Sequence, residues 1–339
     1  MKTILVTGGA GFIGSHTVVE LAEAGYRPVV IDNFSNSEHF IIERLGRLLN
    51  SPVACYDQDY QDIDKLQSVI KKEHVSGIIH FAAFKSVNES VERPLEYYDN
   101  NVAGLIRLLE ACEQSSVKHF IFSSSCTVYG EPDKLPVSED SPLKPAASPY
   151  GATKQMGEAI LADASRVSKH YNGMSLRYFN PIGAHHSSLI GELPKGIPAN
   201  LVPFVTQTAA GLHAKLKVYG DDYPTPDGTC VRDYIHVVDL ANAHVKALAY
   251  LERQAPSFYD FVNVGTGAGS SVMEVIKTFE RVTGQKLAYD VAPRRSGDVV
   301  ATYASVDKAQ RLLGWQAKKT LSDALIDAWR WQEQQKKPH

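Results

Sequence analysis

The stretch that decides the fold is "TILVTGGAGFIGSH", residues 3–16. Its apolar start predicts a buried strand, and apolar residues at helical spacing over 12–24 predict a helix directly after that strand. Gly8, Gly11 and Gly14 lie in the turn between them, where glycine permits a close approach of the backbone to a phosphate. A strand, a glycine-rich turn and a helix in this order predict a dinucleotide-binding unit, with the free N–H groups of the helix start facing the anion.

Apolar runs continue to alternate with helical patterns along the first half of the chain. The expected strands are 28–33, 52–57, 77–82, 119–124 and 174–179, and the expected helices are 62–73, 94–113 and 149–170. Several of the runs are apolar throughout, which is typical of a parallel sheet covered on both faces. We therefore predict an α/β protein with a doubly wound parallel sheet of the Rossmann type.

The second half of the chain differs from the first in composition and in hydrophobic periodicity. Residues 180–203 are rich in Gly, Pro and His with weak periodicity, which predicts a long ordered loop. The elements expected after it are a strand near 216–219, helices near 239–253, 271–283 and 321–332, and a strand near 258–264. We predict an NAD-binding domain over 1–180 and a smaller α/β substrate domain over 181–339, with some C-terminal segments packing on the first domain.

Composition excludes several classes of protein. The chain has 339 residues, a net charge of -3 and 44% hydrophobic residues, so neither a basic nucleic-acid surface nor a polybasic membrane patch is expected. No apolar run approaches the roughly 20 residues that span a bilayer. The four cysteines are scattered and the twelve histidines show no metal-binding spacing, which predicts reduced thiols, a cytoplasmic location and no metal.

Asp32 ends the second expected strand, 18 residues after Gly14. A carboxylate at this place accepts hydrogen bonds from the adenosine ribose hydroxyls and repels a 2′-phosphate. The residues that follow, "NFSNS" (33–37), contain no arginine, so the sequence favours NAD over NADP.

The stretch "SPYGATK" (148–154) places Tyr150 and Lys154 four residues apart, on one face of a helix that Ser148 can cap. A phenol has a pKa near 10, and a neighbouring ammonium and a positively charged nicotinamide favour the phenolate, so we expect Lys154 and the cofactor to lower the pKa of Tyr150. The serines of "FSSSCTVYG" (122–130) end the preceding strand and are expected in the same cleft. The group predicts a proton donor and acceptor beside a nicotinamide.

Seven motifs together resemble the UDP-glucose 4-epimerase family of the extended short-chain dehydrogenases/reductases. They are "TGGAGFIGSH" (7–16), "HFAAFKSVNESVERPLEYYDNNVAG" (80–104), "FSSSCTVYG" (122–130), "SPYGATK" (148–154), "LRYFNPIGAH" (176–185), "GTCVRDYIHVVDLANAH" (228–244) and "APRRSGDVVATYASVDKA" (292–309). The resemblance implies tightly held NAD⁺ and a UDP-hexose whose C4 is inverted through a 4-keto intermediate that swings about its phosphate link. It assigns proton transfer to Tyr150, orientation of the 4-hydroxyl to Ser125, and ribose binding to Lys154.

The resemblance also implies which residues contact each ligand. Those expected at NAD are Gly8, Gly11, Phe12, Ile13, Gly14, Asp32, Asn33, Asn36, Ser37, Asp59, Tyr60, Phe81, Ala82, Ala83, Lys85, Asn100, Ser123, Tyr150, Lys154 and Phe179. Those expected at the UDP-sugar are Lys85, Ser125, Tyr150, Asn180, Asn200, Leu201, Val218, Tyr219, Arg232, Tyr234, Arg295, Asp298 and Thr302. Arginines suit a diphosphate by charge and by fork geometry.

Structural alternatives remain open for some of these residues. Arg232 can form an ion pair with Asp233, Arg294 and Arg295 can be a solvated pair, and Asn180 can be a turn residue. The resemblance further implies a homodimer paired through helices near 95–113 and 150–170. Ala103, Leu105, Leu108 and Leu109 are the candidates for that seam, with the protein core as their alternative.

Rival functions differ in what they require. A 4,6-dehydratase needs an acid and a base where this chain has Ser125, Cys126 and Thr127, so elimination of water would lack its proton carriers. A 4-epimerase of another UDP-sugar, a uronate or a pentose, stays open, and a non-catalytic NAD-sensing protein is the alternative from another class. Thr302 stands where the family often has a bulky tyrosine, which extends the prediction to UDP-GlcNAc and UDP-GalNAc.

Overall fold

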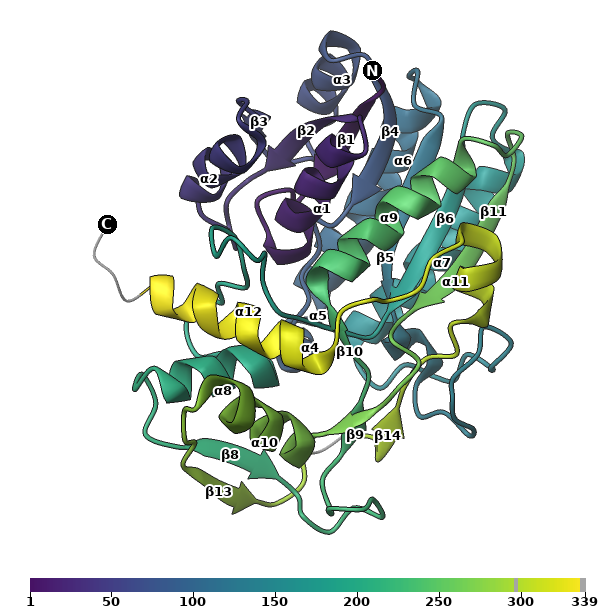
Figure 1. Cartoon of the computed structure of the whole chain (residues 1–339). Coiled ribbons are helices and arrows are strands. Elements are labelled where there is room, and N and C mark those ends of the chain that lie inside the picture. Colours follow the sequence, from purple (N-terminus) through teal and green to yellow (C-terminus); the bar gives the residue numbers. More distant parts are fainter. Residues whose placement is uncertain (296–297, 336–339) are drawn as a thin grey trace.

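The glycine-rich stretch folds into the predicted unit. In this computed structural model, which describes residues 1–295 and 298–335, β1 (Thr3–Thr7) is buried along its whole length. The helix α1 (Phe12–Glu23) begins directly after Gly11. β1 pairs in parallel with β2 on one side and with β4 on the other, so the turn that follows it opens at the middle of a sheet (Figure 1).

The central sheet has seven parallel strands in the order β11-β6-β5-β4-β1-β2-β3. The others besides β1 are β2 (Arg27–Asp32), β3 (Ala54–Asp57), β4 (Val75–His80), β5 (His119–Ser125), β6 (Asn172–Tyr178) and β11 (Tyr259–Val264). The chain builds outward from β1 to β3, then returns and builds from β4 in the other direction. Ligands of such sheets bind outside the carboxyl ends of the strands at this switch point, and the predicted Rossmann-type fold is confirmed.

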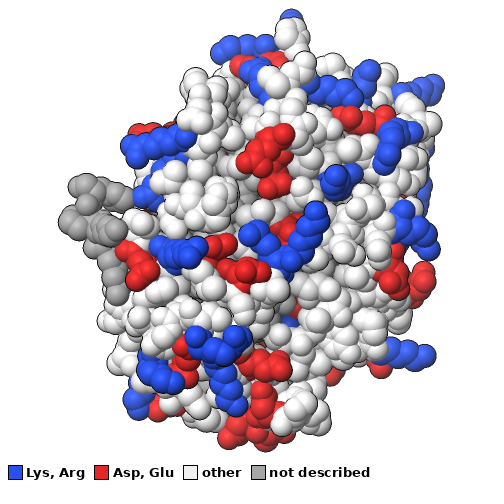
Figure 2. All heavy atoms as spheres, in the orientation of Figure 1, with Lys and Arg blue, Asp and Glu red and all other residues white. Residues whose placement is uncertain are grey.

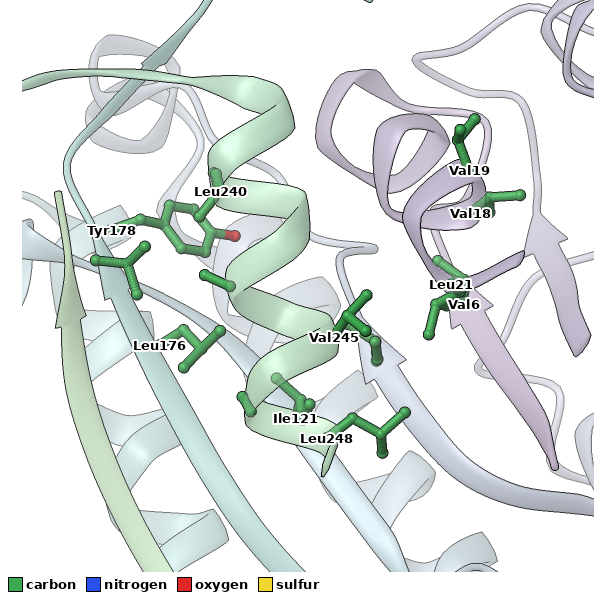
Figure 3. Close-up of a cluster of buried hydrophobic side chains, with 14 of the residues drawn as sticks. Val6, Val18, Val19, Leu21, Ile121, Leu176, Tyr178, Leu240, Val245 and Leu248 are labelled. Atoms are coloured by element: carbon green, nitrogen blue, oxygen red, sulfur yellow. The ribbon is translucent and has the colours of Figure 1, made fainter. Parts of the chain in front are cut away.

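Helices cover both faces of the sheet, which explains why its strands are apolar throughout. Ile4 and Val6 face a core built with α1, α2 (Phe40–Leu49) and α9 (Val237–Leu251), whereas Leu5 faces the opposite core. That second core is built with α3 (Ile63–Lys72), α6 (Gly104–Glu113) and α7 (Pro149–Val167). Figure 3 shows Leu240, Val245 and Leu248 of α9 packed over β5 and β6, beside α1.

The expected helix over 94–113 is present, but a π-helical turn interrupts its α-helical pattern. It runs through α5 (Pro94–Tyr98), the π-helical turn over Asp99–Ala103 and α6, and a separate short helix, α4 (Val87–Glu92), precedes it. Asn100 and Asn101 fall in that turn, and π turns are frequent at functional sites. The two asparagines, both poor helix formers, are the sequence signal for the interruption.

Most of the remaining elements form a smaller group below the sheet in Figure 1. They are β7 (Asn180–Ile182), α8 (Leu201–Ala209), β8 (Leu216–Tyr219), β9 (Val231–Arg232), β10 (Tyr234–His236), β12 (Ser270–Ser271), α10 (Val272–Thr283), β13 (Tyr289–Ala292), β14 (Ala301–Thr302) and α12 (Leu321–Gln334). α8, α10 and α12 share one apolar core with β8. The strand expected at 258–264 does not belong here: as β11 it pairs with β6 at the edge of the central sheet.

Four α-helices of the described residues lie outside the predicted ones: α2, α4, α8 and α11 (Asp307–Leu313). The expected loop at 180–203 includes β7 at its start and the first turn of α8 at its end. Figure 2 shows acidic and basic side chains interspersed over the face in view. Within residues 1–295 and 298–335, no helix is both long and apolar enough to cross a membrane.

Candidate active site

The turn after β1 has no room for side chains at its glycine positions. Gly8 has a φ of +70°, and a Cβ atom there would lie 2.8 Å from the backbone nitrogen of Ala82. A Cβ atom at Gly14 would lie 2.2 Å from the carbonyl oxygen of Gly8. No side chain caps the start of α1, so its first N–H groups are left for another acceptor. The backbone therefore offers a cradle for a pyrophosphate, and these residues fit a dinucleotide.

Asp32 is buried at the end of β2 and is tied to the glycine turn. One carboxylate oxygen accepts a hydrogen bond from the Ala10 amide at 2.9 Å, and the other accepts from the Phe34 amide and the Ser37 hydroxyl. A carboxylate has about four acceptor positions, so capacity remains for ribose hydroxyls. The structure also brings a cation that the local sequence does not reveal: the Lys195 ammonium donates to the carbonyls of Phe34 and Ser35.

Tyr150 and Lys154 do share one face of α7, as predicted. Ser148 caps the helix by accepting from the Gly151 amide, and the Lys154 ammonium lies 5.8 Å from the centroid of the Tyr150 ring. The same ammonium donates to the Ser123 carbonyl at 2.6 Å, and its distance to the Ser123 hydroxyl is 3.4 Å. The contact fixes α7 against the end of β5.

The expected effect of Lys154 on Tyr150 is not found in this structure. Burial raises the pKa of Tyr150 to about 12, and a hydrogen bond with Ser125 offsets only part of that rise. Burial also lowers the pKa of Lys154 to about 7, against the opposing influence of Glu158. Desolvation penalises the charged form of each residue and is the largest cause of both shifts. A phenolate at Tyr150 therefore needs positive charge beyond that of Lys154.

A buried ion pair supports the strand end from behind. Arg177 on β6 donates to both carboxylate oxygens of Glu158, which stands one turn beyond Lys154 on α7. Glu158 also accepts from the Ser124 hydroxyl. Arg177 in turn donates to the Tyr129 hydroxyl at 2.9 Å. The network joins α7, β5 and β6 under the serines, so their position is fixed from several elements.

Asn101 is a residue of this site that the sequence reasoning missed. Its amide group accepts from the Phe84 amide at 2.9 Å and donates to the Phe84 carbonyl and to the Thr153 hydroxyl. Thr153 lies directly before Lys154. Asn101 thus joins the segment after β4, which carries Lys85, to the helix that carries Tyr150.

The second half of the chain gathers most of the residues expected at the UDP-sugar. Arg232 forms its ion pair with Asp298 at 3.1 Å, in place of the pair with Asp233 that the sequence suggested. Asp233 instead accepts the backbone amides of residues 266, 267 and 304. The guanidinium of Arg295 stacks on Tyr219, 3.9 Å from its ring centroid.

The predicted NAD residues lie on several segments that follow neighbouring strands. Gly8, Gly11, Phe12, Ile13 and Gly14 follow β1; Asp32, Asn33, Asn36 and Ser37 end or follow β2; Asp59 and Tyr60 follow β3; Phe81, Ala82, Ala83 and Lys85 follow β4; Ser123 ends β5; and Phe179 follows β6. Tyr60 is buried and donates to the carbonyl of Asn100, which favours a structural role for its hydroxyl.

The predicted sugar residues are spread over six short elements. Asn180 starts β7, Asn200 and Leu201 begin α8, Val218 and Tyr219 end β8, Arg232 lies in β9, Tyr234 starts β10, and Thr302 lies in β14 beside Arg232. Val218 and Tyr234 are buried, so their side chains form part of the scaffold. Residues 296–297 of the arginine motif lie outside the described residues, between Arg295 and Asp298. Arg294 forms an exposed ion pair with Asp222, which agrees with the solvated alternative for this arginine.

The glycine turn, the buried carboxylate after β2 and the Ser125–Tyr150–Lys154 group define a Rossmann-fold enzyme of the short-chain dehydrogenase/reductase class. A Bacillus subtilis protein named UDP-glucose 4-epimerase is 50% identical over 329 residues, covering 97% of this chain and 96% of the relative. The chain belongs to the UDP-glucose 4-epimerase family.

Solved structures agree with this assignment over nearly the whole chain. The UDP-glucose 4-epimerase of Stenotrophomonas maltophila, with bound NAD and formylated UDP-arabinopyranose, is 45% identical with a TM-score of 0.96 over 99% of both chains. That of Bifidobacterium longum, in complex with NAD⁺ and UDP, is 46% identical with a TM-score of 0.93 over 98% of both.

The family model for GDP-mannose 4,6 dehydratase matches residues 5–327, which reflects the shared scaffold. The chemistry at the strand end differs from what a dehydratase needs. Ser125, Cys126 and Thr127 carry no carboxylate, and burial raises the pKa of the Cys126 thiol to about 12. A thiol that stays protonated cannot act as the base for elimination.

The glycine cradle makes a direct prediction. Gly14→Ala should abolish copurified NAD, because the new Cβ atom has no room beside the Gly8 carbonyl. NAD released from the denatured protein measures the occupancy. Gly46→Ala is the matched control, since its Cβ atom meets nothing closer than 3.6 Å. Full NAD content in Gly14→Ala would contradict the cradle.

Proposed function

We propose that this protein is an NAD-dependent isomerase that interconverts UDP-glucose and UDP-galactose by inverting C4. The observation that carries the proposal is the group formed by Tyr150, Ser125 and Lys154 at the carboxyl end of β5. Family membership over almost the whole chain gives the reaction and the substrate. The dehydratase alternative fails at Cys126 and Thr127, as described above.

The residues of the chain divide the chemistry between them. Tyr150 takes the proton from the sugar 4-hydroxyl and returns it after the sugar has presented its other face. Ser125, whose side chain partly offsets the rise in the pKa of Tyr150, holds that hydroxyl in line with the phenol. Lys154 fixes α7 through Ser123 and keeps further N–H donors for a ribose.

NAD⁺ fits the residues that would hold it. The turn at Gly8 and Gly14 suits the pyrophosphate, and Asp32 suits the adenosine ribose and disfavours a 2′-phosphate. When bound, NAD⁺ supplies the acceptor for the C4 hydride and a positive charge. That charge is what Tyr150 requires, since burial raises its pKa to about 12 and Lys154 alone does not offset the rise.

Replacing the proposed acid-base group tests the reaction. Tyr150→Phe should lower kcat for UDP-galactose by about 10²- to 10⁴-fold, with NAD content unchanged. Tyr289→Phe, at an exposed tyrosine of β13, is the control. The assay is run without added NAD. Absence of turnover by folded, NAD-loaded wild-type protein would favour a non-catalytic NAD-binding protein instead.

We also propose that UDP-GlcNAc and UDP-GalNAc are substrates. Thr302 pairs with Arg232 across β14 and β9, and its small side chain leaves space where the family often has tyrosine. UDP-uronates and UDP-pentoses remain candidates, so one coupled assay should compare UDP-glucose, UDP-GlcNAc and UDP-glucuronate.

Thr302→Tyr tests the space beside Arg232. The variant should lose most of its activity on UDP-GlcNAc and keep that on UDP-glucose, because only the N-acetyl group requires the added volume. Initial rates on both sugars give the ratio. Wild-type activity on UDP-GlcNAc below about a hundredth of that on UDP-glucose would contradict the proposal, as would an unchanged ratio in the variant.

The proposed homodimer rests on the family and on exposed apolar side chains of α4 to α7. Of the four candidates for the seam, Leu105, Leu108 and Leu109 are buried in the core of the single chain, and Ala103 is half-buried. Val91 and Leu95 are instead 62% and 80% exposed, on helices that contact α7. We also propose a cytoplasmic location, consistent with four free cysteines.

Leu95→Asp tests the dimer. Wild-type protein should show twice the chain mass of 37.3 kDa by light scattering, and the variant should be monomeric because the charge would be buried at the seam. Leu212→Asp, at another exposed leucine, should remain dimeric. Monomeric wild-type protein at micromolar concentration would refute the dimer.

A further inference from the structure

A short segment of the second half runs beside the cofactor half. We call residues 189–195 the strap; in Figure 1 the chain passes here between α2 and α12. On the α2 side, Arg44 donates to the Leu189 carbonyl at 3.2 Å. On the α12 side, the Trp331 indole donates to the Glu192 carbonyl at 2.9 Å. The backbone of the strap is therefore held from both directions.

The packing around Glu192 leaves its backbone little freedom. A Cβ atom at Gly191 would lie 2.5 Å from the Trp331 ring, so the ring is pressed against the strap directly before Glu192. Ile190 is fully buried. The Glu192 side chain is itself only 10% exposed.

One carboxylate oxygen of Glu192 accepts from two residues that come from opposite sides of the site. The Lys85 ammonium, on the segment after β4, lies 3.3 Å from it, and the Asn200 amide, at the start of α8, donates to it at 2.9 Å. Both donors are exposed side chains, whereas the acceptor is held. Because the Lys85 end of this pair is exposed to solvent, the pair contributes little to stability, and the contact is better explained by the two side chains that it orients.

We propose that Glu192 is a positioning residue for the UDP-sugar: it holds Lys85 and Asn200 in the orientation in which they receive the substrate. The inference rests on the proposed function, because both residues are expected at the UDP-sugar. Glu192 restricts the rotamers of Lys85 and Asn200 before the UDP-sugar binds, so that less side-chain entropy is lost on binding. It affects binding and not the proton transfer at Tyr150, so its loss should appear in KM.

The experiment measures UDP-galactose kinetics of Glu192→Gln, Glu192→Ala, Lys85→Ala and the double variant Glu192→Gln/Lys85→Ala. Gln keeps an acceptor for Asn200 and removes the charge that attracts Lys85. We expect KM for UDP-galactose to rise about 3-fold in Glu192→Gln and about 10-fold in Glu192→Ala, with kcat changed less than about 2-fold. In the Lys85→Ala background, Glu192→Gln should have no further effect on KM.

Asp163→Asn is the matched control, because Asp163 forms an exposed ion pair with Arg166 away from the strap. Melting temperatures of all variants separate positioning from stability, and the Gln variant keeps the test valid if the Ala variant does not fold. Unchanged KM in Glu192→Gln, an equal effect with and without Lys85, or a fall in KM would overturn the inference. Turnover by the wild type in the same assay shows that such a failure concerns Glu192 and not the proposed reaction.

Discussion

The hydrogen bond from the Lys154 ammonium to the Ser123 carbonyl is the interaction on which the site depends. The Lys154 nitrogen lies 2.6 Å from the Ser123 carbonyl oxygen, so the bond joins α7 to the end of β5. The lysine is buried at this place. It holds the helix that carries Tyr150 against the strand that ends at Ser125. The Glu158–Arg177 pair behind the serines gives that buried ammonium a favourable carboxylate, although desolvation is the larger effect.

Burial gives this site its chemical character. A phenol at the surface titrates near pH 10, whereas here the pKa of Tyr150 is raised to about 12. The site is therefore poised in its neutral form and becomes basic when a positive charge enters beside it. Bound NAD⁺ would supply that positive charge, and its nicotinamide would also accept the hydride. Proton removal would therefore be coupled to the oxidised form of the cofactor.

Much of this could be predicted from the sequence because it depends on local spacing. Gly8, Gly14 and Asp32 belong to one strand–turn–helix–strand unit, and Tyr150 and Lys154 are one helical turn apart. The apolar runs predict the strands of the central sheet. They do not show that the strand at 258–264 pairs with β6 at the edge of that sheet.

Other features depend on contacts between residues far apart in the sequence. Asn101 donates a hydrogen bond to Thr153, 52 residues later in the sequence, and Glu192 accepts one from Lys85, 107 residues earlier. No local pattern marks either pair. The pKa of Tyr150 shows the same limit, because spacing reveals the nearby ammonium but not the burial that raises this pKa.

The fate of the C4 hydrogen tests the account most directly. UDP-galactose labelled with deuterium at C4 should give UDP-glucose that keeps the deuterium at C4, with no NAD added and no hydrogen taken from solvent. Loss of the label to water, or a requirement for added NAD, would contradict a hydride that leaves and returns within one closed site.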